Sequence, residues 1–148
     1  MTTRSAAALL ALLVTYTALA AQERAVQASR VPAAVREALA RAYPTATALH
    51  WTSEREHGRT IYEVESTDGA IHRDLQIVSD GTIIETETQV APEQLPPAVR
   101  SAAAAAGGRI RIAEVVVTGR DTVYEIKRLN QRGELRLLRD GTKAPAEP

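Results

Sequence analysis

The 148-residue sequence contains no cysteine, no phenylalanine and only one tryptophan. The absence of cysteine excludes disulfide bonds and a lipid attached to a cysteine, so the fold must be stabilised by burial alone. Because large aromatic side chains are scarce, the core must be built from Val, Ile, Leu, Ala and Tyr. The chain carries 18 basic and 18 acidic residues, and this balance argues against a general nucleic-acid or anionic-membrane binder.

Motifs of catalysis are missing as well. There is no G-x-S-x-G sequence, no Gly-rich phosphate loop and no plausible His–carboxylate–Ser order. His50, His57 and His72 lack the spacing of a zinc site and belong to different predicted elements. The sequence therefore predicts a protein that is not an enzyme, with no catalytic residues, no metal site and no cofactor. A small hydrolase with an unrecognised site is the competing hypothesis.

The N-terminus has the features of a secretory signal peptide. Arg4 precedes an apolar run from Ala6 to Leu19, and Ala18-Leu19-Ala20 is a small-residue cleavage site. A membrane anchor is the alternative, but the run is shorter than the ~20 apolar residues that a spanning helix needs. We expect cleavage after Ala20, a periplasmic or secreted mature protein, and no membrane span after cleavage.

The mature chain suits one domain or two very small ones. We expect a flexible N-terminus over residues 21–30, a first unit over residues 31–90 and a linker over residues 91–94. A second, truncated unit then occupies residues 95–142, and residues 143–148 form a tail. Val31-Pro32 predicts the start of a helix, which Pro44 ends.

Alternating residues predict antiparallel strands in the first unit, over residues 47–53, 60–66, 71–77 and 82–90. In the first of them, Leu49 and Trp51 are expected on one face. Asp68-Gly69 is a two-residue hairpin signal, and with these two residues as the loop Tyr62 lies opposite Leu75. One sheet face is then mostly apolar, made of Tyr62, Val64, Ile71, Leu75 and Ile77. The other is polar, made of Glu63, Glu65, His72, Asp74 and Gln76. This alternation predicts helices on one sheet face only.

The second half repeats the first. Val123-Tyr124-Glu125-Ile126 echoes Ile61-Tyr62-Glu63-Val64, and Asp140-Gly141-Thr142 echoes Asp80-Gly81-Thr82. The start of the helix at Val31-Pro32 also recurs, at Leu95-Pro96. We therefore predict an α+β fold of two tandem helix-plus-antiparallel-sheet repeats. The sequence leaves open whether the two units share one continuous sheet or lie side by side.

These motifs, in this order and behind a signal peptide, resemble the PepSY-like family related to secreted β-lactamase-inhibitor proteins. The resemblance covers about Val31 to Thr142. It implies a secreted or periplasmic, non-enzymatic protein that binds or inhibits a protein or peptide partner, such as a secreted hydrolase or peptidase. In the inhibitor proteins a concave sheet face with aromatic and charged residues holds the target enzyme. This chain has no disulfides and few strand aromatics, which argues against a β-lactamase as the target.

Five residues are the candidate partner-binding residues: Trp51, Glu63, Glu65, His72 and Asp74. Trp51 is either the main core anchor or an interface hot spot, and its strand neighbour favours the core. The acidic residues Glu63, Glu65 and Asp74, with Glu85 and Glu87 as an extension of the row, have three alternative interpretations: a docking surface for a basic peptide, a weak Ca²⁺ site or a solvated face. The alternative function is a structural or sensory accessory protein of the cell envelope. The oligomeric state does not follow from the sequence.

Overall fold

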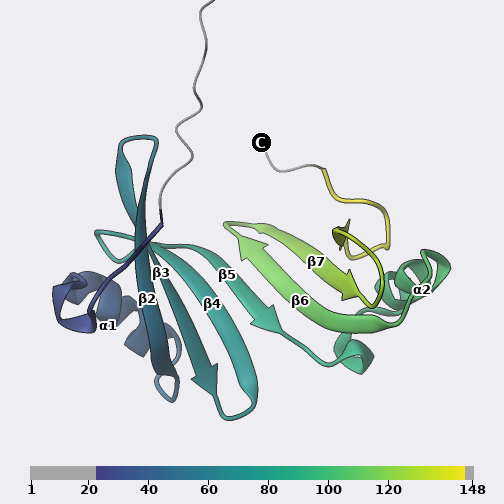
Figure 1. Cartoon of the computed structure of the whole chain (residues 1–148), viewed down its shortest axis with the longest axis horizontal. Coiled ribbons are helices and arrows are strands. Elements are labelled where there is room, and N and C mark those ends of the chain that lie inside the picture. The colour runs from purple at the N-terminus through teal and green to yellow at the C-terminus, as the bar shows by residue number, and fades with distance from the viewer. Residues whose placement is uncertain (1–22, 146–148) are drawn as a thin grey trace, which may run out of the picture.

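The computed structural model describes residues 23–145, so the predicted signal peptide and residues 146–148 lie outside the described residues. Eight strands form one antiparallel sheet in which each strand pairs with its neighbour in the sequence (Figure 1). The strands are β1 (Arg24–Ala25), β2 (Thr47–Glu56), β3 (Arg59–Asp68), β4 (Ile71–Val78), β5 (Ile83–Gln89), β6 (Ile110–Thr118), β7 (Asp121–Arg128) and β8 (Glu134–Leu137). The α-helices are α1 (Ala33–Ala42) and α2 (Pro97–Ala105), and the 3-10 helices are η1 (Ala28–Arg30) and η2 (Pro92–Gln94). The α+β fold is therefore confirmed.

A single sheet resolves the arrangement that the sequence left open. β5 pairs with β6, from Glu85 opposite Thr118 to Gln89 opposite Glu114. This pairing joins the strands of the first half to those of the second, across the connection that contains α2. The whole described chain is consequently organised around one sheet rather than two separate ones.

Each helix begins after a proline and covers the nearest part of the sheet. Pro32 is the N-cap of α1, whose Val35, Ala38 and Leu39 are buried. Pro96 is the N-cap of α2, whose Val99 and Ala103 are buried. Because the buried side chains of α2 are smaller than those of α1, the second helix contributes less apolar area to its core.

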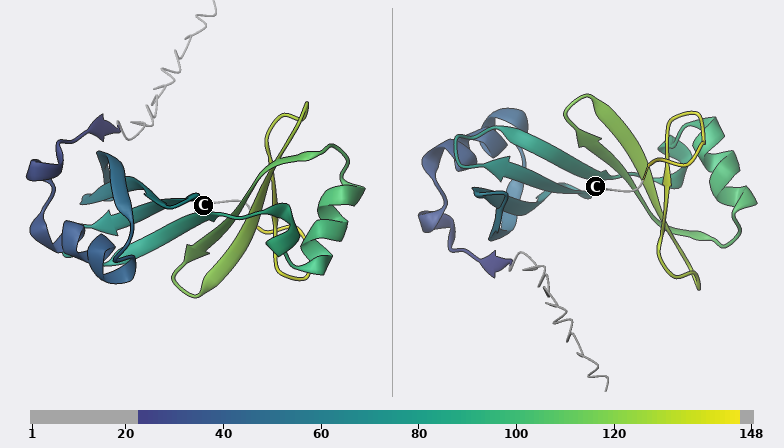
Figure 2. Two further views of the ribbon diagram at one scale, coloured as in Figure 1. Left: turned by 90° about the horizontal axis from the view of Figure 1, so that it is seen from below. Right: turned by 90° about the horizontal axis from the view of Figure 1, so that it is seen from above.

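The core is divided into two clusters, one beneath each helix. Around α1, the first cluster contains Trp51, Val64, Leu75 and Ile77 from the sheet. Around α2, the second contains the sheet residues Ala113, Tyr124, Ile126 and Leu137. The strand register places all of these sheet residues on the same face, as predicted for helices on one side. The two helices lie at opposite ends of the molecule (Figures 1 and 2).

The Asp-Gly turn that follows β4 packs against α1, and the turn after β8 packs against α2 in the same way. A Cβ added to Gly81 would lie 2.7 Å from the backbone oxygen of Ala34. The same measurement from Gly141 to the backbone oxygen of Ala98 also gives 2.7 Å. Both glycines have a positive φ, +89° and +82°, so each turn needs glycine for its backbone conformation and for the close approach of a helix.

The flexible N-terminus predicted over residues 21–30 stays a prediction; among its described residues, Arg24 pairs with Ser53 and Ala25 with Thr52 of β2, and η1 follows. One prediction about local structure was wrong. Leu49 was expected to share the face of Trp51, but it is 58% exposed. The register shifts between Ala48 and His50, so a β-bulge at Leu49 turns its side chain out of the alternation.

The predicted hairpin register also needed correction. Asp68 pairs with Ile71, so the loop is Gly69-Ala70, and Tyr62 lies opposite Ile77 rather than Leu75. Asp68 stays in the ladder, and its carboxylate accepts a hydrogen bond of 2.9 Å from the Thr45 hydroxyl. Because the partner shifts by two residues, every side chain keeps its predicted face.

Candidate docking face

The sheet face opposite the helices, called the open face here, is rich in carboxylates. Glu65 lies opposite Asp74, which in turn lies opposite Glu87 on the next strand. Farther along the sheet, Glu114 lies opposite Glu125. Like charges directly opposite each other destabilise a sheet. The acidic residues of the central strands on this face are Glu63, Glu65, Asp74, Glu85, Glu87, Glu114 and Glu125.

Four of the five candidate partner-binding residues lie on the open face. Glu63, Glu65, His72 and Asp74 alternate with core residues along β3 and β4. The fifth, Trp51, is only 6% exposed and packs in the cluster beneath α1. Trp51 is thus unavailable to a partner, because its position opposite Val64 directs it toward the helix.

Burial and neighbouring carboxylates raise the pKa of two acids in the first half of the open face, Glu63 and Asp74. Burial raises the pKa of Glu63, and the nearby charges of Glu23 and Asp74 raise it further. Burial also raises the pKa of Asp74, with Glu65 adding to the effect. Both carboxylates are therefore harder to ionise than ordinary surface acids.

The densest group of carboxylates lies where the two halves of the sheet join. Oxygens of Glu87, Glu114 and Glu125 all lie within 4.8 Å of one another. These three residues, called the carboxylate triad here, come from β5, β6 and β7. The sequence indicated Glu87 only as an extension of the acidic row and did not indicate Glu114 or Glu125. The β6–β7 pairing puts Glu114 opposite Glu125, and the β5–β6 pairing then brings Glu87 beside them.

Two cations neutralise part of the triad. The Lys127 ammonium lies 2.9 Å from Glu114 and 3.4 Å from Glu134. The Arg136 guanidinium donates a hydrogen bond of 2.8 Å to Glu125. Within residues 23–145, no hydrogen bond or ion pair reaches the Glu87 carboxylate. Glu87 is therefore the triad member whose charge is least compensated.

Burial is the main cause of the raised pKa values of Glu87 and Glu125. Burial raises the pKa of Glu87 to about 7, and the charges of Glu125 and Glu114 raise it further. Val116, which lies opposite Glu87 and is only 3% exposed, provides apolar surroundings. The pKa of Glu125 is also raised to about 7, by burial first and then by a hydrogen bond with Glu134, whereas Arg136 lowers it.

We expect the substitution Glu87→Gln to stabilise the protein at neutral and alkaline pH. The pKa of Glu87 is 4.5 in an ordinary setting and about 7 in the fold, so between these values the folded state binds the proton more tightly. Ionised Glu87 thus destabilises the fold above about pH 7, and this cost disappears as the pH falls toward 4.5.

Urea unfolding of wild type and the Glu87→Gln variant would measure this difference. We expect a gain on the order of 1 kcal/mol at pH 8, reduced from the full linkage value because solvent screens a half-exposed group. The gain should shrink steadily as the pH falls below 7 and vanish only below about pH 4.5. A variant that is equally or less stable than wild type at pH 8 would contradict the raised pKa.

Metal binding is not supported by this arrangement. The triad is the one group of three close potential metal ligands among the described residues. It contains no histidine, and Lys127 and Arg136 already pair with two of its carboxylates. Calcium takes six to eight oxygen ligands, and with one oxygen from each residue the triad supplies three of them. The absence of a metal site stays a prediction.

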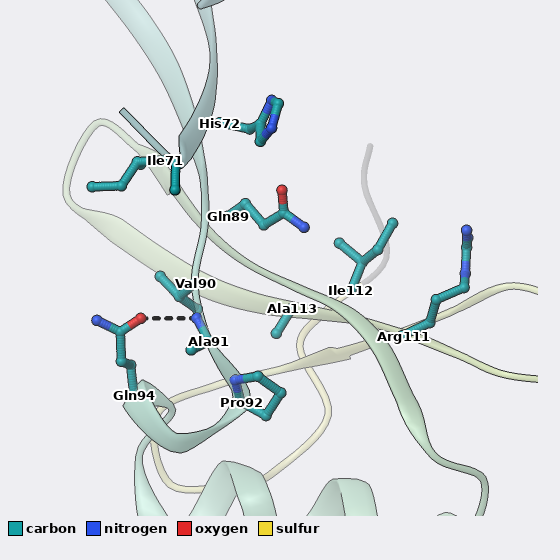
Figure 3. Close-up of a pocket in the computed structure, with 11 residues that line it drawn as sticks. Ile71, His72, Gln89, Val90, Ala91, Pro92, Gln94, Arg111, Ile112 and Ala113 are labelled. Carbon is teal, nitrogen blue, oxygen red and sulfur yellow. Dashed lines mark hydrogen bonds between the residues drawn. The ribbon is translucent and has the colours of Figure 1, made fainter. Parts of the chain in front are cut away.

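A pocket of about 580 Å³ lies between the start of β4 and the segment from Gln89 to Gln94, and its lining comes from both faces of the sheet (Figure 3). The β4–β5 ladder ends at Arg73 opposite Thr88, whereas β5 continues along β6 and the Val90 N–H donates a hydrogen bond of 2.9 Å to the Ala113 carbonyl. Two apolar side chains, Ile71 and Ile112, line the space between the diverging strands. Polar or basic side chains line it as well, among them His72, Gln89 and Arg111.

None of the helices among residues 23–145 is both long enough and apolar enough to cross a membrane.

Comparison with known proteins identifies the fold. No family model matches the chain, and no curated protein matches its sequence. A BLIP-like protein from Bacteroides fragilis superposes with a TM-score of 0.60 at 20% identity, over 77% of this chain and 84% of that one. A DUF2874 family protein from Bacteroides uniformis gives 0.61 at 22% identity, over 77% and 86%.

A third solved structure, of a proposed periplasmic protein from Bacteroides eggerthii, gives a TM-score of 0.59 at 17% identity, over 78% of this chain and 86% of that one. At these identities the likeness concerns the fold alone. The eight-stranded sheet with its two helices therefore has a BLIP-like fold, and this part of the resemblance predicted from the sequence motifs is confirmed.

Proposed function

We propose that this chain is an exported, non-enzymatic protein that binds a basic partner protein through the open face of its sheet. The observation that carries the proposal is the row of carboxylates on the sheet face that neither α-helix covers. Oppositely charged surfaces steer association and specify a partner. A basic surface would also relieve the repulsion among the facing acids Glu65, Asp74 and Glu87, which the fold maintains at a cost to its own stability.

The pocket beside His72 gives the partner a second point of attachment. Ile71 is 43% exposed at its margin, and Ile112 lines it from β6. Apolar side chains of a partner that enter such a pocket would supply the desolvated centre that protein interfaces need. A partner that combines lysine or arginine with a neighbouring apolar side chain would therefore match both features. Inhibition of a secreted hydrolase or peptidase is one consequence that such binding could have.

We also propose that the chain consists of two PepSY-like units. Equivalent positions support this: Tyr62 lies opposite Ile77 and Tyr124 lies opposite Leu137, in each case with the Asp-Gly turn close behind. The packing of Gly81 on Ala34 also matches that of Gly141 on Ala98. The signal peptide predicted at Arg4 to Ala20 and the similarity of the fold to a proposed periplasmic protein support the proposed export of this chain.

The docking face can be tested by site-specific crosslinking. A photoreactive amino acid placed at His72, on the open face, should capture a basic protein from a cell-envelope extract of the source organism. The same amino acid at Glu37, on the exposed surface of α1, should not capture that protein. Mass spectrometry would identify it, and titration calorimetry with the purified partner would then measure the affinity.

Matched charge reversals test the role of the acidic row. We expect Glu65→Lys to weaken binding by about tenfold or more, because it places a cation on the docking surface. Glu37→Lys makes the same change at an exposed site on α1 and should leave the affinity within about twofold. Equal effects of the two substitutions, or capture of the same protein from both crosslinking positions, would contradict docking through the open face.

A further inference from the structure

The carboxylate triad lies at the centre of the proposed docking face. Its members come from three adjacent strands, and their oxygens lie within 4.8 Å of one another. Three negative charges at this distance repel one another strongly where Val116 and the surrounding sheet exclude water. A proton held within the triad removes one of these charges and relieves the repulsion.

The groups that face Glu87 are mostly acidic. Glu85 lies on the same strand, Asp74 lies opposite on β4, and the other two triad members lie on β6 and β7. The cations near the triad are occupied by other acids, Lys127 by Glu114 and Glu134, and Arg136 by Glu125. The charged or titratable residues around Glu87 on the neighbouring strands are His72, Asp74, Glu85, Glu114, Glu125, Lys127, Glu134 and Arg136.

We propose that the carboxylate triad is a pH-sensitive switch, which holds a basic partner at neutral to alkaline pH and weakens its binding in mild acid. This inference rests on the proposed function, because the partner is the one that docks on the open face. Protonation of Glu87 and Glu125 removes negative charge from the centre of that face. The raised pKa of about 7 for both groups places this change near neutral pH.

The switch itself can be tested without a partner. Side-chain carboxyl carbons of ¹³C-glutamate-labelled mature protein would be followed by NMR as the pH is varied. We expect at least one glutamate signal to titrate near pH 7 and to disappear in Glu87→Gln. Glu85→Gln is the matched control on the same strand and face, and the step should persist in it. Titration of every glutamate below about pH 5.5 would overturn the switch.

Gating of binding needs a basic probe of constant charge. A labelled, end-blocked peptide of alternating arginine and valine, without histidine, would be titrated at about pH 8 and about pH 6 at fixed ionic strength. Wild type should lose about fivefold or more in affinity between the two, and Glu87→Gln should lose clearly less. Both proteins retain His50 and His72, so any contribution of these imidazoles cancels in the comparison.

The two experiments separate failure of the switch from failure of the proposed function. A neutral titration step together with pH-independent binding, or an equal loss in wild type and Glu87→Gln, would overturn the gating while leaving the docking face intact. Two outcomes would overturn the docking face and the gate together: the peptide does not bind at either pH, or it binds no better than a peptide with glutamine in place of arginine. This holds for any result of the NMR titration.

Discussion

Replacing Trp51 with alanine is expected to lower the free energy of unfolding by about 3–5 kcal/mol. Trp51 is 6% exposed and packs beneath α1, so its removal leaves a large cavity between the helix and the sheet. The loss would be a large fraction of the stability of a domain of this size. Urea denaturation followed by circular dichroism would measure the change, since the variant loses the only tryptophan and with it the convenient fluorescence signal.

Leu49→Ala is the matched control on the same strand. Leu49 is 58% exposed at the bulge, so its truncation should change the free energy of unfolding by no more than about 0.5 kcal/mol. A variant Trp51→Phe, which keeps most of the volume, should recover much of the loss. A Trp51→Ala protein that unfolds like wild type but no longer binds the partner would place the indole at the interface instead.

Replacing Gly81 with alanine is expected to be the second most damaging change. A positive φ of +89° is strained for alanine, at about 1–2 kcal/mol. The new methyl group would also lie 2.7 Å from the backbone oxygen of Ala34, so the turn or α1 must move, and such overpacking costs a further ~1–3 kcal/mol. The same denaturation experiment would give the total.

Gly69→Ala separates these two costs. Gly69 also has a positive φ, +61°, but no atom lies within 4 Å of the Cβ position, so only the backbone strain applies. Gly141→Ala should behave like Gly81→Ala, because its methyl group would meet Ala98 at the same 2.7 Å. Equal losses for Gly69→Ala and Gly81→Ala would show that the packing of the turn on α1 contributes nothing.

The two halves of the fold differ in how much they bury. Trp51 pairs with Val64 in the first half, and Ala113 pairs with Ile126 at the corresponding place in the second. In the helices, Leu39 of α1 is buried where α2 has Ala103. The second core is therefore built from smaller side chains at these positions and buries less apolar area there.

Local patterns in the sequence determined most of the elements. Proline residues specified where α1 and α2 begin, and glycine specified the turns, because these effects act within a few residues. Alternation of apolar and polar residues placed Glu63, Glu65, His72 and Asp74 on the face away from the helices. The predicted hairpin register differs from the observed one by two residues. The assignment of side chains to faces is still correct, since strand faces repeat with a period of two.

Tertiary structure alone decided which strands pair and which side chains become neighbours. The bulge that exposes Leu49, the single sheet formed through β5 and β6, and the meeting of Glu87 with Glu114 and Glu125 all depend on pairings between strands. Such pairings are selected by packing across the sheet and by the helices that cover it, neither of which is encoded in a short stretch of residues. The sequence by itself therefore determined that this face is acidic, whereas the fold decided which of its carboxylates lie within 4.8 Å of one another.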